Sequence, residues 1–136
     1  MFFACTSNHV IEELDFETTY CEGNCPVFRI KIAKNGFATY NAISNNKISG
    51  EFESVISQED YNELVRLLNY TNFKGLNQHY KINVTDHSSV ILNIKYDGNH
   101  LKKIDDYGQK GTSELVSFYE FVFKLVNRQN WKRIKK

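Results

Sequence analysis

Two cysteines, a glycine and the only proline of the chain lie within six residues, Cys21-Glu22-Gly23-Asn24-Cys25-Pro26. Two thiols at this spacing have four possible roles: a disulfide, a redox pair that exchanges disulfides with a substrate, half of a metal site, or two buried thiols. An exchange catalyst usually stabilises its thiolate at a helix N-terminus. Here Pro26 opens a strand-like run, so no helix dipole is expected beside the pair.

A metal site at these cysteines would need further ligands. Structural zinc normally has four, arranged in recognisable pairs. His79 and His87 are eight residues apart and form no standard framework with Cys21 and Cys25. We therefore predict no metal and no cofactor, and in an oxidising compartment we expect a Cys21–Cys25 disulfide.

Asp86 and His87 are the one adjacent acid and imidazole, and two serines follow them. Such residues act as base and nucleophile in hydrolases. Neighbours on an extended segment point to opposite faces, so we favour a turn or cap role for Asp86 and predict no catalytic residue. Asp105, Asp106 and Tyr107 follow a predicted strand, and two acids without further oxygen ligands are a weak calcium signal. These five residues form the candidate functional surface.

The composition describes an ordinary globular domain. The chain has 136 residues, of which 41% are hydrophobic, enough for one core. The formal net charge is +1, from 17 basic and 16 acidic side chains, so no global field attracts nucleic acid. Most of the aromatic residues fall in periodic apolar segments, which favours packing over base stacking. We therefore expect no nucleic acid partner.

The first eight residues, Met-Phe-Phe-Ala-Cys-Thr-Ser-Asn, resemble the end of a bacterial lipoprotein signal, in which a small residue precedes an acylated cysteine. The small residue is Ala4 and the cysteine is Cys5. Phe2 stands where an aliphatic residue is usual, and the charged start and most of the apolar region are absent. A start codon placed too late, or a trimmed N-terminus, would explain the absent charged start and apolar region. No run reaches the 18 apolar residues of a membrane-spanning helix, so the only membrane contact we expect is a lipid anchor on Cys5.

Alternating apolar residues predict most of the strands. Asn35-Gly36 and Asp97-Gly98 are hairpin turns, and Gly50 is a possible bulge. The predicted strands span residues 14–20, 28–33, 37–43, 47–55, 90–96 and 100–104.

Two helices complete the prediction. Ser57 caps the first, whose apolar residues recur at helical spacing, and Thr112 or Ser113 caps the second, which continues to about Asn127 and is apolar on more than one face. The order β-β-β-β-α-β-β-α indicates an α+β fold with an antiparallel sheet of about six strands and two helices on one face. Its predicted divisions are an N-terminal tether or signal remnant (1–13), a single domain (14–131) and a basic tail (132–136).

Several of these features together resemble one bacterial family, the domain of unknown function 6438. The resemblance covers roughly residues 14–131. It rests on Cys-x-Gly-x-Cys-Pro at 21–26, Asn35-Gly36, Thr39-Tyr40, Gly50, Ile56-Ser57, the Leu64/Leu67/Leu68 helix, Phe73, Leu76, Tyr80, Thr85-Asp86, the run 103–107, the Leu115 helix and Trp131. It implies no activity, because the family has no agreed catalytic residues, but its members often look exported or lipid-anchored.

The sequence therefore predicts a lipid-anchored cell-envelope module on the periplasmic or outer-surface side, which binds an unknown protein or small molecule and contains a structural disulfide. The alternatives are a thiol-disulfide exchange protein that uses Cys21 and Cys25, and a hydrolase at Asp86 and His87.

Overall fold

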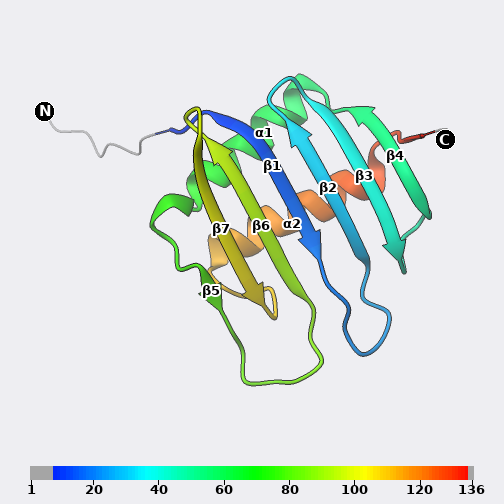
Figure 1. Cartoon of the computed structure of the whole chain (residues 1–136), viewed down its shortest axis with the longest axis vertical. Helices are drawn as coiled ribbons and strands as arrows, with labels where there is room; N and C mark the ends of the chain where they lie inside the picture. Colours follow the sequence, from blue (N-terminus) through cyan, green and yellow to red (C-terminus); the bar gives the residue numbers. More distant parts are fainter. Residues whose placement is uncertain (1–7, 135–136) are drawn as a thin grey trace, which may run out of the picture.

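The computed structural model describes residues 8–134, and within them the chain forms one eight-stranded sheet and two α-helices (Figure 1). A short 3₁₀ helix, η1, follows the first helix. The elements are β1 (Ile11–Thr18), β2 (Val27–Ala33), β3 (Phe37–Ser44), β4 (Gly50–Val55), α1 (Gln58–Tyr70), η1 (Phe73–Gly75), β5 (His79–Tyr80), β6 (Ser89–Tyr96), β7 (His100–Tyr107), α2 (Ser113–Arg128) and β8 (Lys132–Arg133).

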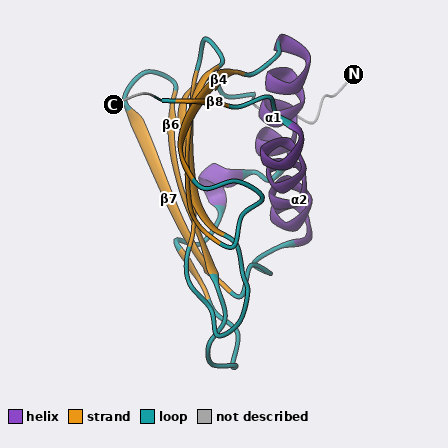
Figure 2. Cartoon of the chain, turned by 90° about the vertical axis from the view of Figure 1, so that its right-hand side faces the viewer, coloured by secondary structure: helices purple, strands orange, loops and turns teal. Residues whose placement is uncertain are grey.

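Both helices lie on the same face of the sheet, and the other face is open (Figure 2). The strands alternate because one set of side chains enters the layer between sheet and helices while the next set points outward. Phe16 is fully buried at the centre of that layer, and its ring packs against Phe28, Phe118, Tyr119 and Phe123. The core is therefore one apolar layer between the sheet and α2, with α1 beside it.

The strand order across the sheet is β5-β7-β6-β1-β2-β3-β4-β8. β1 is central because it pairs antiparallel with β2 on one side and with β6 on the other. Its Ile11 end faces Tyr96 at the β6–β7 turn, and its Thr18 end faces Val90 at the start of β6. The β1–β2 loop and the segment that leads into β6 therefore lie at the same end of the sheet.

The prediction of about six antiparallel strands is wrong in number and in direction. β5 pairs in parallel with β7, and β8 pairs antiparallel with β4, so the sheet is mixed. Each of the two missed strands has two residues, which is too short for any alternation to be visible in the sequence. The α+β class and the two helices on one face are confirmed. Gly50 begins β4, and residues 132–133, predicted to belong to a basic tail, form β8.

The helices begin where their caps predict. Ser57 accepts a hydrogen bond from Asp60 N through its Oγ (3.1 Å), and Thr112 Oγ1 accepts one from Leu115 N (3.1 Å). The breadth of the apolar surface on α2 corresponds to deep burial, since its face toward the sheet includes Phe118 and Val122 at 0% exposure. No helix within residues 8–134 is long and apolar enough to cross a membrane.

A bidentate ion pair joins the two helices at their exposed side. Arg128 donates from Nη1 and Nη2 to the two carboxylate oxygens of Asp60, at 2.9 and 2.8 Å. These hydrogen bonds hold the pKa of Asp60 below its usual value. Because the folded pKa is lower than the unfolded one, this stabilisation is present above the unfolded pKa and is lost as the pH falls toward the folded pKa.

We predict that Arg128→Gln lowers the free energy of unfolding at pH 7 by about 0.5–1 kcal/mol, the usual value for an exposed pair of good geometry. The difference from the wild type should shrink below about pH 4, where Asp60 in the unfolded chain becomes protonated. Urea unfolding at both pH values measures it. Lys124→Gln, which removes an exposed charge of α2 that makes no ion pair within residues 8–134, is the control, and equal pH dependence of the two variants would contradict the prediction.

Candidate functional site

Cys21 and Cys25 form a disulfide in the loop between β1 and β2, with Cα atoms 5.9 Å apart. Pro26 directly precedes β2, so the pair is followed by a strand, as the sequence indicated. The helix terminus that stabilises the thiolate of exchange catalysts is not adjacent in the chain. The predicted disulfide is confirmed, and it lies within the loop from β1 to β2, residues 19–26, which we call the disulfide corner.

Hydrogen bonds connect this corner to the neighbouring loops. Thr18 Oγ1 donates to Pro26 O (2.8 Å) and accepts from Phe28 N (3.0 Å), which closes the corner across its base. Glu22 N, inside the disulfide loop, donates to Asp86 O at 3.1 Å. The disulfide corner therefore supports the segment 81–88, which connects β5 to β6.

Tyr107 fixes the other side of this segment. Its hydroxyl donates to Val84 O (2.7 Å) and accepts from His87 N (3.1 Å), so a side chain at the end of β7 holds two points of the 81–88 backbone. Asp86, between them, has a φ of +63°, a left-handed conformation that Asp tolerates better than most residues. The segment is thus attached both to the sheet and to the disulfide corner.

A glycine makes room for the third attachment. A Cβ on Gly108 would lie 2.5 Å from Ile82 Cδ1, and its φ of +92° is itself suited to glycine. Ile82 can therefore pack directly on the backbone that follows β7. This contact anchors the beginning of the segment, whereas Tyr107 and Glu22 hold its middle and end.

A hollow of about 640 Å³ lies between the 81–88 segment and the β5–β7 edge of the sheet. We call it the loop hollow. It is lined by His79, Tyr80, Lys81, Val84, Thr85, Asp86, Asp105 and Tyr107. Val84 and Tyr107 give it apolar surface, while Lys81, Asp86 and Asp105 supply charges of both signs. An apolar hollow with a few polar groups is the usual form of a small-ligand site.

The structure brings together most of the predicted functional surface, but not all of it. Asp86, Asp105 and Tyr107 line the loop hollow. His87 lies next to it, with its ring 6.5 Å from the ring of Tyr107. Asp106 points to the other side of the sheet and is 0% exposed.

Asp106 stabilises the start of α2. Its carboxylate accepts hydrogen bonds from Lys110 N (3.2 Å), Gly111 N (2.8 Å) and the hydroxyl of Tyr119 (2.7 Å). Burial, and then the bond to Asp106, raises the pKa of Tyr119 well above its usual range. Asp106 therefore organises the turn from β7 into α2 and does not face a ligand.

The alternative chemistries find little geometric support among the described residues. The side chains of Asp86 and His87 share no hydrogen bond within residues 8–134, so they do not form the acid–imidazole pair of a hydrolase there. In the same part of the chain, no three His, Cys, Asp or Glu side chains gather closely enough to hold a metal ion. Cys5, the predicted lipid anchor, lies outside the described residues.

His79, Lys81 and Val84 were not predicted to lie beside Asp105 and Tyr107, because the β5–β7 pairing, which places His79 opposite Asp105, is invisible in the sequence. A signal for Asp106 was present. Ile104 and Asp106 are alternate residues, and extending the predicted strand from Ile104 to Tyr107 puts Asp106 on the buried face.

The family model described as Domain of unknown function (DUF6438) matches residues 12–126. The match begins in β1 and ends in α2, so it includes the disulfide corner and the loop hollow. The comparison with curated proteins finds no match.

We predict that replacing both cysteines by serine (C21S/C25S) accelerates amide hydrogen exchange in residues 81–88 by more than the loss of global stability accelerates it in β3, because the disulfide corner bonds to Asp86 but lies away from the centre of β3. The closed loop is short, so the free energy of unfolding should fall by only about 2 kcal/mol. Exchange mass spectrometry and urea unfolding measure the two effects. Cys5→Ser is the control, and unchanged exchange at 81–88 would show that the disulfide does not support this segment.

Proposed function

Because the chain belongs to the DUF6438 family, a family described only as a domain of unknown function, we propose a function from the geometry of the chain itself: it is a binding module. The module takes an apolar group of a small molecule or of a protein segment into the loop hollow. Lys81, Asp86 and Asp105 at its margin orient the polar part of the ligand. Neither thiol exchange nor hydrolysis is part of this proposal.

The observation that carries the proposal is the construction of the hollow. Exposed loops rarely keep an apolar cavity open, because a flexible segment collapses onto it. Here the Tyr107 hydroxyl holds two points of the 81–88 backbone, and the disulfide corner holds a third. Such a preformed wall lowers the entropy cost of binding. Val84 is 54% exposed on this wall, which leaves apolar surface available to a ligand.

We also propose that the module acts in the cell envelope, on the periplasmic or outer-surface side, tethered by a lipid on Cys5. The disulfide supports this location, since such bonds persist mainly in oxidising compartments. The polar segment after Cys5 is short enough to hold the domain near a membrane.

The contacts of His9 fix the end of the domain from which the proposed tether leaves. His9 N donates to Asn69 Oδ1 (2.8 Å), and His9 Nδ1 lies 2.6 Å from Asp97 Oδ2 at the β6–β7 turn. This turn is at the opposite end of β1 from the disulfide (Figure 1). The eight residues of β1 span about 25 Å. A lipid on Cys5, four residues before His9, therefore directs the loop hollow away from the membrane.

Indole, a small apolar probe, tests the binding proposal. We predict that titration with indole shifts the amide NMR signals of residues 79–86 and 105–107. Val84→Asp should weaken binding about tenfold, because it replaces apolar contact area with a charge beside Asp86 and Asp105. Val55→Asp is the matched control, since Val55 is an exposed valine as well (65%, against 54% for Val84) and lies on β4, away from the hollow.

Shifts confined to the hollow and lost in Val84→Asp support the proposal. Shifts that are absent, or that persist unchanged in Val84→Asp, overturn it.

Intact mass tests the location. We predict that the protein expressed from its full upstream reading frame gains lipid mass on Cys5, and that Cys21 and Cys25 resist alkylation until a reductant is added. Cys5→Ser should lose the lipid mass and keep the protected pair. Unmodified Cys5 with both other thiols free would place the protein in a reducing compartment and rule out the envelope assignment.

A further inference from the structure

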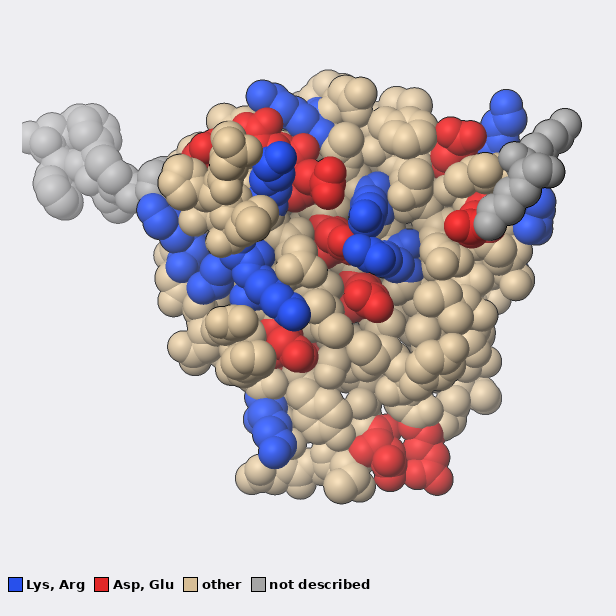
Figure 3. All heavy atoms as spheres, in the orientation of Figure 1, with Lys and Arg blue, Asp and Glu red and all other residues tan. Residues whose placement is uncertain are grey.

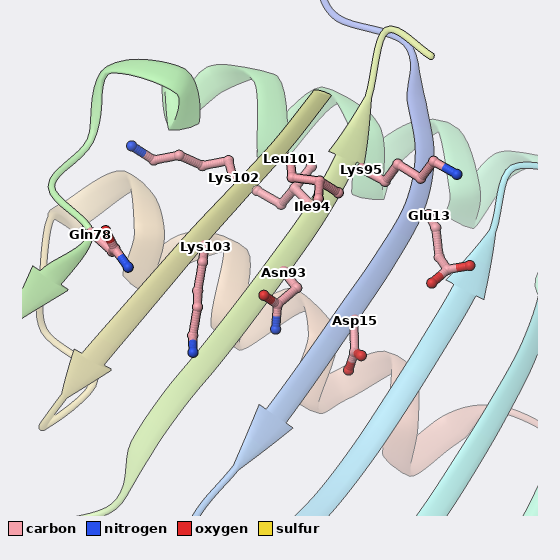
Figure 4. A pocket seen from close by; sticks show the side chains of 9 residues that line it. All are labelled: Glu13, Asp15, Gln78, Asn93, Ile94, Lys95, Leu101, Lys102 and Lys103. Carbon is pink, nitrogen blue, oxygen red and sulfur yellow. The ribbon is translucent and has the colours of Figure 1, made fainter. Parts of the chain in front are cut away.

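A second hollow, of about 450 Å³, lies on the open face of the sheet over β1, β6 and β7 (Figure 4). We call it the lysine hollow. On this face basic side chains gather over β6 and β7, and acidic and basic side chains alternate toward the middle of the sheet (Figure 3). The residues that matter for its chemistry are Glu13, Asp15, Asn93, Lys95, Leu101 and Lys103.

Strand register arranges these residues in two rows. Lys95 pairs with Glu13 on β1 and with Leu101 on β7. In the next row, Asn93 pairs with Asp15 and with Lys103. Side chains of directly paired residues stand about 5 Å apart on one face of a sheet. Lys95 and Lys103 are diagonal neighbours, about 7–8 Å apart at their bases, and in Figure 4 Lys95 extends toward β1 whereas Lys103 points along β7. Both side chains are long enough to turn toward one ligand group above Asn93.

Asp15 is already paired with Arg29, whereas Lys95 and Lys103 can still bind a ligand. Arg29 binds Asp15 through Nε–Oδ1 (3.0 Å) and Nη2–Oδ2 (2.6 Å), and these bonds raise the pKa of the Arg29 guanidinium. The charge of Asp15 is thus already balanced. Across residues 8–134, the ammonium groups of Lys95 and Lys103 have neither a salt bridge nor a hydrogen-bond acceptor. Two unpaired cations with one nearby anion, Glu13, favour a ligand group with a single negative charge.

The lysine hollow and the loop hollow lie next to each other along β7 and share no lining residue. Lys103, Asp105 and Tyr107 are alternate residues of β7 and so point to the same face. Gln78, which lines the first hollow, precedes His79, which lines the second. From Lys103 to Tyr107 the strand rises about 13 Å, the length of roughly four residues of extended chain. We therefore take the two neighbouring hollows together as one candidate trough, with a basic end and an apolar end.

We propose that this trough binds an extended peptide whose carboxylate lies between Lys95 and Lys103 and whose apolar side chain enters the loop hollow. The proposal rests on the binding function above and names its ligand class. The amides of Asn93 and Gln78 lie between the two ends and can pair with peptide groups. A flat anionic membrane fits less well, because the lysines line a concave surface next to Glu13, which repels it.

The probe is an acetylated tetrapeptide with phenylalanine first and three alanines after it, compared with its C-terminal amide. We expect the free acid to bind the full-length Cys5→Ser protein about fivefold more tightly than the amide, a difference typical of exposed charge pairs. Lys95→Gln/Lys103→Gln should abolish the difference. Lys124→Gln, which removes a lysine from the exposed side of α2, should keep it. NMR titration gives affinities and the location of each end.

Equal affinity of the peptide acid and the peptide amide for the wild type would overturn the carboxylate site. If the backbone NMR signals of Val84 and Tyr107 still shift in that case, the binding function proposed above stands. Loss of those shifts with both peptides, and with indole, would remove the binding function as well. Sedimentation with phosphatidylglycerol vesicles that depends on Lys95 and Lys103, without any preference for the acid, would assign these lysines to a membrane surface and overturn the peptide proposal.

Discussion

The pairing of β1 with β6 is the contact that makes one sheet from two antiparallel units. β1 to β4 follow each other as a meander, and β6 and β7 form a separate hairpin after α1. Only β1 pairs with both units. This pairing has a large sequence separation and depends on Leu14 and Phe16 reaching the same apolar layer as Leu92 and Ile94. Because it aligns Thr18 with Val90, it also places the disulfide corner beside the segment that walls the loop hollow.

The end of β7 connects the candidate site to the core. Asp106 and Tyr107 are consecutive, point to opposite faces and have opposite roles. The first binds the turn into α2 from inside the core, and the second holds the 81–88 backbone from the open face. The turn that fixes the helix and the wall that forms the hollow are therefore attached to the same short stretch of β7. A change at either residue is expected to affect both sides of the sheet.

Sequence patterns predicted the elements that have a period and missed those that do not. The alternation of Phe28, Ile30 and Ile32 gave β2, and Asn35-Gly36 gave the β2–β3 hairpin. β5 has two residues and pairs in parallel with a strand about 26 positions later, so no local signal reveals it. The loop hollow depends on that pairing. Asp86, Asp105 and Tyr107 were therefore identified as individual candidates, whereas the cavity that unites them and the facing Val84 were not.

The short strands β5 and β8 have a consequence for crowded surroundings. A sheet whose outer strands are long and bare offers a row of free backbone groups on which another chain can add a strand. Here two-residue strands stand outside β7 and β4, and the guanidinium of Arg133 lies over the ring of Phe52 at 4.7 Å. The two-residue strands cover the edge of β7 only at Asp105 and Asp106 and the edge of β4 only at Phe52 and Glu53. Within the described residues no strand covers positions 100–104 of β7, and the charges of Lys102 and Lys103 there oppose edge-to-edge pairing of copies held side by side at high density.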